Sequence, residues 1–151
     1  MAVRFSAGGV LRVPLADDRF AYAVMLEVFP YIAFYPAASA LNDQRPPGES
    51  PLFILMVERG AYSRDGWGPI LFRLDKKDLP SIPLFFWQDV VDPNQCTLVD
   101  PLGNEREVSP AECIDLERVA VWAADHVEGR LEDYYAGRPN VTAESLRVEL
   151  G

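Results

Sequence analysis

Three strand-like runs lie almost without interruption between residues 8 and 35, and no other stretch constrains the fold as strongly. In the first run, Leu11, Val13 and Leu15 share one face, which is the period of two that marks a half-buried strand. Apolar residues repeat this alternation between residues 20 and 28. The fold is therefore expected to begin with a sheet.

Two turn signals separate these runs. Residues 16–19 read Ala-Asp-Asp-Arg, and aspartate tolerates the left-handed backbone that tight hairpins require. Pro30 marks a second break, before the run over residues 31–35. The whole stretch therefore predicts a three-stranded antiparallel meander.

The totals are those of one domain that needs no metal or cofactor. A chain of this size buries roughly 70% of its extended surface on folding. Cys96 and Cys113 are too far apart for a CxxC pair, and with His126 as the single histidine they are too few for a zinc site. We expect reduced, structural thiols and a cytoplasmic protein without a membrane segment, because the sequence has no signal-peptide pattern and no apolar run of about 20 residues.

The charge is unevenly distributed along the chain. Residues 1–88 hold nine Lys or Arg and nine Asp or Glu, whereas residues 89–151 hold five and fourteen, so the net charge of −9 arises entirely from the last part. Such a surface repels nucleic-acid phosphates and attracts cationic partners, although the acidity can also serve solubility alone. We therefore expect no nucleic-acid partner.

The middle of the chain alternates between loops and strands. Residues 36–51 contain four prolines and predict a long loop with at most one or two helical turns around residues 37–42, which is either a partner contact or simply mobile. Residues 52–57 are apolar without alternation, as expected of a central strand that is covered on both faces. Residues 67–72 form another expected strand.

Aromatic residues and a hairpin pattern follow. Residues 80–89 place Phe85, Phe86 and Trp87 between prolines and polar residues, and this cluster is either core or an exposed recognition patch. Residues 97–100 and 105–108 flank a Pro-Leu-Gly-Asn turn and predict a hairpin.

Helix signals fill the last third. Ser109 followed by Pro110 and Glu112 is the strongest helix start, and a first short turn is expected there, with Asp115 as a second cap for the main helix. Apolar positions then follow helical spacing up to Gly137, which predicts one long helix over about 115–136. The tail over residues 140–151 is expected to add a final strand through residues 145–150.

Together these patterns predict a single α+β domain over residues 1–151. We expect a strongly bent, mostly antiparallel sheet or half-barrel with one long C-terminal helix packed against it. Its parts are the meander 8–35, the loop 36–51, further strands in 52–108, the helix at about 115–136 and the tail 140–151.

The residues do not form a recognisable catalytic set. His126 falls within the predicted helix without a nucleophile beside it, so a histidine on the helix surface or the core edge is the better interpretation. There is no GxGxxG or GxxxxGK[ST] phosphate loop. We therefore expect a protein that is not an enzyme and has no catalytic, cofactor or metal residues.

The stretch Gly9–Tyr22, GVLRVPLADDRFAY, resembles the opening of the bacterial Immunity protein 26 family. Residues 32–35 are similar to the third strand of that family, and residues 67–70 to its Trp-containing strand. Residues 84–89 resemble its Pro-aromatic-Asp segment and residues 116–134 its terminal helix. At residues 16–19 the family more often has a glycine.

The resemblance implies an immunity protein that binds and neutralises a cognate protein toxin of a bacterial polymorphic toxin system. We add the hypothesis that acidic side chains dock on a basic toxin such as a nuclease; these are Asp89, Asp92, Asp100, Asp125, Glu128 and Glu132. The alternative is a half-barrel that binds a small ligand or peptide in a pocket lined by Tyr22, Tyr35, Trp67 and Trp87.

Overall fold

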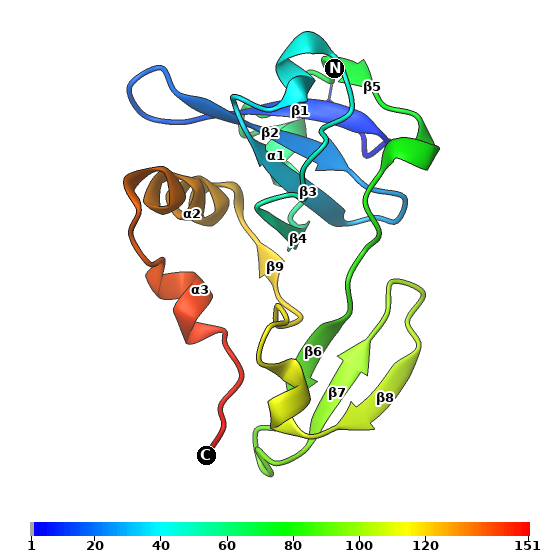
Figure 1. Ribbon diagram of the computed structural model, residues 1–151, viewed down its shortest axis with the longest axis vertical. Helices are drawn as coiled ribbons and strands as arrows, with labels where there is room; N and C mark the ends of the chain where they lie inside the picture. The colour runs from blue at the N-terminus through cyan, green and yellow to red at the C-terminus, as the bar shows by residue number, and fades with distance from the viewer. Residues whose placement is uncertain (1) are drawn as a thin grey trace.

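The computed structural model describes residues 2–151 and contains a large and a small sheet with short helices (Figure 1). The large sheet has six strands in the order β5-β1-β2-β3-β4-β9, and the small sheet has three in the order β6-β7-β8. The strands are β1 (Gly9–Pro14), β2 (Phe20–Met25), β3 (Tyr31–Pro36), β4 (Phe53–Val57), β5 (Phe72–Arg73), β6 (Phe85–Gln88), β7 (Cys96–Val99), β8 (Glu105–Val108) and β9 (Val121–Trp122).

The predicted meander is confirmed, and β1, β2 and β3 pair antiparallel in the middle of the large sheet. The turn between β1 and β2 is also confirmed. Asp17 and Asp18 both have a φ of 59°, and the amide of Arg19 donates to the carbonyl of Ala16 at 3.2 Å. Two successive left-handed residues make a turn whose twist matches that of paired strands. Local chemistry therefore sets this reversal without a glycine.

Both faces of the large sheet are buried. Leu55 of β4 packs in the cluster beneath helix α2 (Ala124–Ala136), whereas Ile54 packs in the opposite cluster, with Phe85 of the small sheet. This explains the apolar run of β4, whose prediction as a strand covered on both faces is confirmed. β4 pairs with β3 on one side and, on the other, with the two-residue β9, which runs parallel to β4. The predicted central position of β4 is therefore wrong, because only β9 separates β4 from the edge of the sheet.

The small sheet follows the predicted hairpin, in which β7 pairs antiparallel with β8 and β6 adds to the other side of β7. The free edge of β6 binds the segment that returns to the large sheet. The amide of Phe86 donates to the carbonyl of Glu117 at 3.1 Å, and the carbonyl of Phe86 accepts from the amide of Val119 at 2.7 Å. Within residues 2–151, β8 is thus the unpaired edge of the small sheet.

The predicted long helix is wrong over its first part, because α2 begins at Ala124 and not near residue 115. Backbone groups of Glu117 and Val119 pair with β6, and β9 pairs with β4, so strand pairing replaces the helical bonds that the spacing suggested. The helix cap is Ala123 rather than Asp115, whereas the short turn after Ser109 is confirmed as the 3-10 helix η3 (Pro110–Cys113) with a capping box.

The expected strand over residues 67–72 is also wrong, since only Phe72 and Arg73 form a strand. Trp67 lies in the loop after helix α1 (Gly60–Ser63), is 1% exposed, and packs edge-on against Phe34 with ring centroids 5.7 Å apart. A large ring that fills the space between sheet and helix stabilises the fold by burial, and this does not need a strand.

The tail differs from the predicted strand as well. Residues Val141–Ser145 form the short helix α3, and the chain beyond it binds side chains of the small sheet region. The Gln88 amide donates to the carbonyl of Glu149 at 2.8 Å and accepts from its amide at 3.0 Å, while Arg118 donates to the carbonyl of Leu146 at 2.9 Å. The side chains of Gln88 and Arg118 thus bind backbone groups of the tail, which in the predicted strand would have paired with another strand.

Two short 3-10 helices, η1 (Ala40–Asp43) and η2 (Lys76–Asp78), complete the elements. The first agrees with the expectation of at most one or two helical turns around residues 37–42 of the proline-rich loop. The α+β fold with a C-terminal helix packed on a mostly antiparallel sheet is thereby confirmed. None of the helices in residues 2–151 has the length and apolar character needed to cross a membrane.

Candidate functional site

The side chains that could bind a metal or act as a nucleophile are scattered. Residues 2–151 contain no cluster of three or more His, Cys, Asp or Glu that could hold a metal ion. His126 is exposed on α2, as its helical position indicated. Cys96 and Cys113 are buried free thiols, and burial together with the neighbouring Cys96 raises the pKa of Cys113 to about 11. The Cys113 thiol is therefore protonated near neutral pH, which is unfavourable for a nucleophile.

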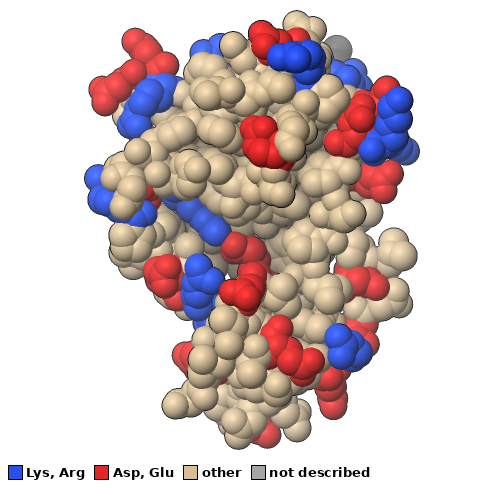
Figure 2. Space-filling model, in the orientation of Figure 1, with Lys and Arg blue, Asp and Glu red and all other residues tan. Residues whose placement is uncertain are grey.

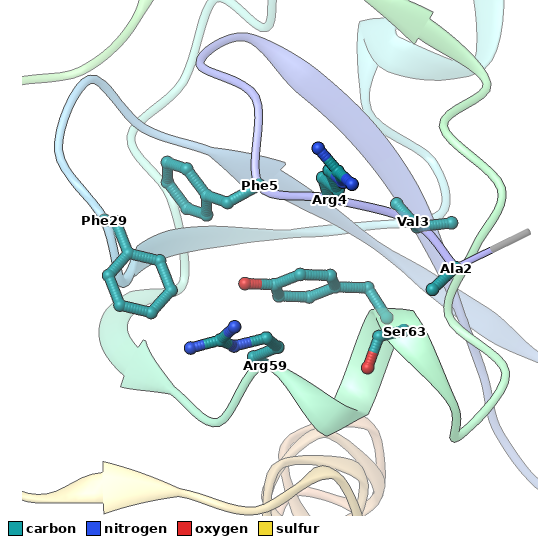
Figure 3. A pocket seen from close by; sticks show the side chains of 8 residues that line it. Ala2, Val3, Arg4, Phe5, Phe29, Arg59 and Ser63 are labelled. Atoms are coloured by element: carbon teal, nitrogen blue, oxygen red, sulfur yellow. The ribbon is translucent and has the colours of Figure 1, made fainter.

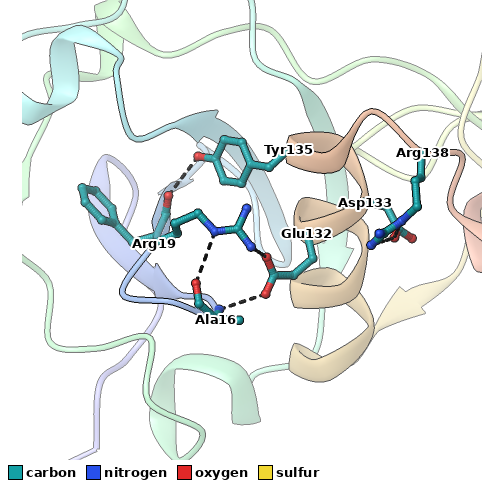
Figure 4. A network of polar contacts seen from close by, with 7 residues as sticks. Ala16, Arg19, Glu132, Asp133, Tyr135 and Arg138 are labelled. Carbon is teal, nitrogen blue, oxygen red and sulfur yellow. Dashed lines mark hydrogen bonds and ion pairs between the residues drawn. The ribbon is translucent and has the colours of Figure 1, made fainter.

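Two of the six predicted partner-binding acids bind residues far away in the sequence. Glu128 accepts the indole N–H of Trp67 at 2.9 Å. Glu132 accepts the amide of Ala16 at 2.8 Å and forms an ion pair with Arg19, so it joins α2 to the turn between β1 and β2 (Figure 4). Both carboxylates stabilise the fold, whereas the sequence-based hypothesis assigned them to the toxin interface.

The other four acids do not form one surface. Asp89 and Asp92 lie in the turn between β6 and β7, whereas Asp100 lies in the turn between β7 and β8, at the opposite end of the small sheet. Asp125 is in the first turn of α2. The structure thus brings Asp89 and Asp92 together and separates them from Asp100.

The turn with Asp89 and Asp92 is organised by its own carboxylates. Oδ1 of Asp89 accepts the amides of Val91 at 2.7 Å and Asp92 at 2.9 Å, and these bonds lower the pKa of Asp89. Oδ1 of Asp92 accepts the amide of Asn94 at 3.1 Å. Carboxylates that bind nearby amides in this way fix the turn without using sheet hydrogen bonds.

This turn presents two apolar side chains to solvent. Val90 is 99% exposed and Val91 is 91% exposed, and Trp87 on the adjoining end of β6 is 40% exposed. The alternatives for the aromatic cluster are thereby resolved residue by residue, because Phe85 and Phe86 are core and Trp87 is surface. The sequence contained a signal for the valines, namely a Val-Val pair inside an otherwise polar turn between two aspartates.

The strand register adds an acidic group beside Trp87. Trp87 pairs with Thr97, and Thr97 pairs with Glu107, so all three side chains lie in one row on one face. Glu107 has no ion-pair or side-chain hydrogen-bond partner within residues 2–151. We call Trp87, Val90, Val91 and Glu107 the Trp87 surface.

Acidic side chains are frequent around the small sheet. On the face drawn in Figure 2, Asp and Glu gather over the lower part, where Figure 1 places β6, β7 and β8. Between residues 84 and 108 the only basic residue is Arg106, against five acids: Asp89, Asp92, Asp100, Glu105 and Glu107. The Trp87 surface therefore combines exposed apolar groups with a negative surround.

The alternative pocket of four aromatic residues is not formed. Tyr22 and Tyr35 are buried in the cluster on one face of the large sheet, and Trp67 is buried in the cluster on the other face. Trp87 lies on the small sheet. The four rings thus lie in three separate places, and the predicted ligand pocket lined by all four is wrong.

Comparisons of the chain with protein-family models, with curated proteins and with solved structures gave no match. The resemblance to the Immunity protein 26 family accordingly stays a prediction that rests on the residues quoted above.

Proposed function

We propose that this protein is a non-catalytic, cytoplasmic immunity protein that neutralises a cognate bacterial toxin by binding it through the Trp87 surface. The observation that carries the proposal is the exposure of Val90 and Val91 beside Trp87 in an acidic surround. Exposed apolar side chains with a polar rim are typical of protein-binding surfaces. The sequence resemblance supports the same function.

The two kinds of side chain have different roles in this proposal. Burial of Trp87 and the two valines against the toxin lengthens the life of the complex, since apolar and aromatic anchors dominate interface energies. Negative charge from Asp92 and Glu107 attracts a basic toxin, such as a nuclease, and mainly accelerates association.

The geometry of the turn favours tight binding. Because Asp89 already holds the amides of Val91 and Asp92, the turn is ordered before the partner arrives. Preorganised segments lose less conformational entropy on association than flexible ones.

The experiment captures partners of the tagged protein from its native host at low salt and elutes them through a salt gradient, with identification by mass spectrometry. The parent is compared with a Val90→Ser/Val91→Ser double variant and with Val141→Ser, a matched change at an exposed valine on α3. We expect one basic polypeptide in a stoichiometric complex with the parent and with Val141→Ser, and its loss from the double variant.

A growth assay tests neutralisation itself. The captured polypeptide is produced in a host cell with or without the parent protein, and we expect growth only when the parent is present. A partner that the double variant retains fully would reject the Trp87 surface. A captured polypeptide that does not inhibit growth would reject the immunity function.

A further inference from the structure

A second feature lies at the other end of the molecule from the small sheet, near the amino terminus (Figure 1). It is a cavity of about 580 Å³ between the segment 2–5, the turn that follows β2, and the start of α1. Figure 3 shows Phe5 and Phe29 together at one end of it and Arg4 and Arg59 on opposite sides. This volume is within the range of pockets that hold small molecules, about 300–1,000 Å³.

The charge of the cavity is opposite to that of the protein. Arg4 and Arg59 are its only charged lining residues, whereas the whole chain has a net charge of −9. Within residues 2–151, neither guanidinium has a carboxylate at ion-pair distance. The cation of Arg59 instead lies 5.9 Å from the ring centroid of Phe29. The cavity is therefore a locally positive region on an acidic protein.

A buried hydroxyl provides independent evidence of a ligand. Tyr62 lines the cavity, is 3% exposed, and its hydroxyl has no hydrogen-bond partner in the described part of the chain. Burial raises the pKa of Tyr62, and the charge of Arg59 acts in the opposite direction, so the two groups are close enough to interact. Buried polar groups are nearly always hydrogen-bonded, and each exception requires an explanation.

The remaining lining is apolar. The rings of Phe5 and Phe29 meet edge to face with centroids 5.4 Å apart, and the ring of Tyr62 lies 6.5 Å from that of Phe5. Val3 and Ala2 continue this surface. Such a lining favours a ligand with an aromatic or branched apolar body over a small hydrophilic ion.

We propose that this cavity binds a small organic carboxylate with an aromatic body. The carboxylate pairs with the guanidinium of Arg59 and accepts a hydrogen bond from the hydroxyl of Tyr62, and the aromatic body packs against Phe5 and Phe29. A planar guanidinium matches a carboxylate in two parallel hydrogen bonds, and Arg4 adds positive charge at the rim.

The test titrates phenylacetate into the full-length protein by isothermal calorimetry and by NMR. Phenethylamine, which has the same ring with a cationic group, and 2-phenylethanol, which is neutral, are titrated in parallel. We expect saturable binding of phenylacetate alone. Equal binding of phenethylamine, or no saturable binding of phenylacetate, would overturn the proposal.

Three variants locate the site. Arg59→Gln and Tyr62→Phe are expected to weaken phenylacetate binding about tenfold or more, because each removes a hydrogen bond to a charged group. Arg45→Gln, at an exposed arginine that pairs with Asp43 in the loop after β3, is the matched control and should bind as the parent does. Unchanged affinity in both Arg59→Gln and Tyr62→Phe would overturn the assignment.

Folding does not confound the Tyr62 variant. Tyr62→Phe removes only a hydroxyl that has no partner, so its melting temperature without ligand should equal or exceed that of the parent. A variant that is equally stable and binds phenylacetate more weakly identifies the hydroxyl as a ligand contact. Because the Trp87 surface is not part of this cavity, its partner binding should be the same in all three variants.

Discussion

The indole Nε1–H of Trp67 donates a 2.9 Å hydrogen bond to Oε2 of Glu128, which joins the loop after α1 to the middle of α2. Trp67 is almost completely buried, so its N–H has no access to solvent as an alternative partner. This contact makes Glu128 part of the structure, although its helical position alone suggests a surface residue.

Replacing Glu128 therefore tests the internal role. Glu128→Ala leaves the indole N–H without an acceptor and should lower the free energy of unfolding by about 1–3 kcal/mol. Glu128→Gln retains an acceptor oxygen and should cost less. Urea unfolding measures both, with Glu144→Ala on the exposed side of α3 as a control. Equal stability of Glu128→Ala and the parent would show that this bond contributes nothing.

Gln88 is expected to anchor the tail. Gln88→Ala removes both bonds to the backbone of Glu149, and we expect a loss of about 1–2 kcal/mol together with faster proteolytic cleavage after α3. Gln95→Ala, in the adjoining turn, is the matched control because its side chain makes no hydrogen bond within residues 2–151. If the tail of Gln88→Ala is cleaved no faster than that of the control, the anchoring role is wrong.

Acid should weaken the protein partly through Asp133. Hydrogen bonds from the side chains of Asn140 and Arg138 lower the pKa of Asp133 in the folded state. Because the folded pKa is below the unfolded one, the stabilisation is present above about pH 4 and is lost as the pH falls through the folded pKa.

Melting temperatures across this pH range measure the effect. The difference between the parent and Asp133→Asn should be constant near neutral pH and shrink below about pH 4. In an Arg138→Gln background the same replacement should produce a smaller pH-dependent difference, since one donor is already missing. A difference that is independent of pH would contradict the proposed coupling.

The core position Ile54 should not tolerate a charge. Ile54→Asp places a carboxylate among buried aromatic and aliphatic side chains, at a cost comparable to the total stability of about 5–15 kcal/mol. We expect no cooperative thermal transition by circular dichroism. Ile114→Asp, at an isoleucine that is 44% exposed, should melt near the parent. A cooperative transition of Ile54→Asp near that of the parent would refute the prediction.

Features that depend on neighbouring residues could be predicted from the sequence. The turn at Asp17 and Asp18 forms because aspartate accepts left-handed backbone angles, and the cap at Ser109 forms because Glu112 is three residues away. The period of two located β1 and β2, but the half-buried strand that it predicted is wrong for β2, where Ala23 is buried in one cluster and Val24 in the opposite one. Alternation along a strand cannot reveal that a distant segment covers the second face.

The tertiary structure decided the features that depend on distant partners. Residues 117–122 have helical spacing, yet the backbone of residues 117–119 pairs with β6, and residues 121 and 122 pair with β4. These pairings supply the hydrogen bonds that a helix would otherwise form, and they link the two sheets. Glu128 and Glu132 face inward because Trp67 and the turn at Ala16 present unpaired N–H groups to them. The cavity at Arg59 and Tyr62 likewise collects side chains from three separate segments, and no pattern within one segment could reveal it.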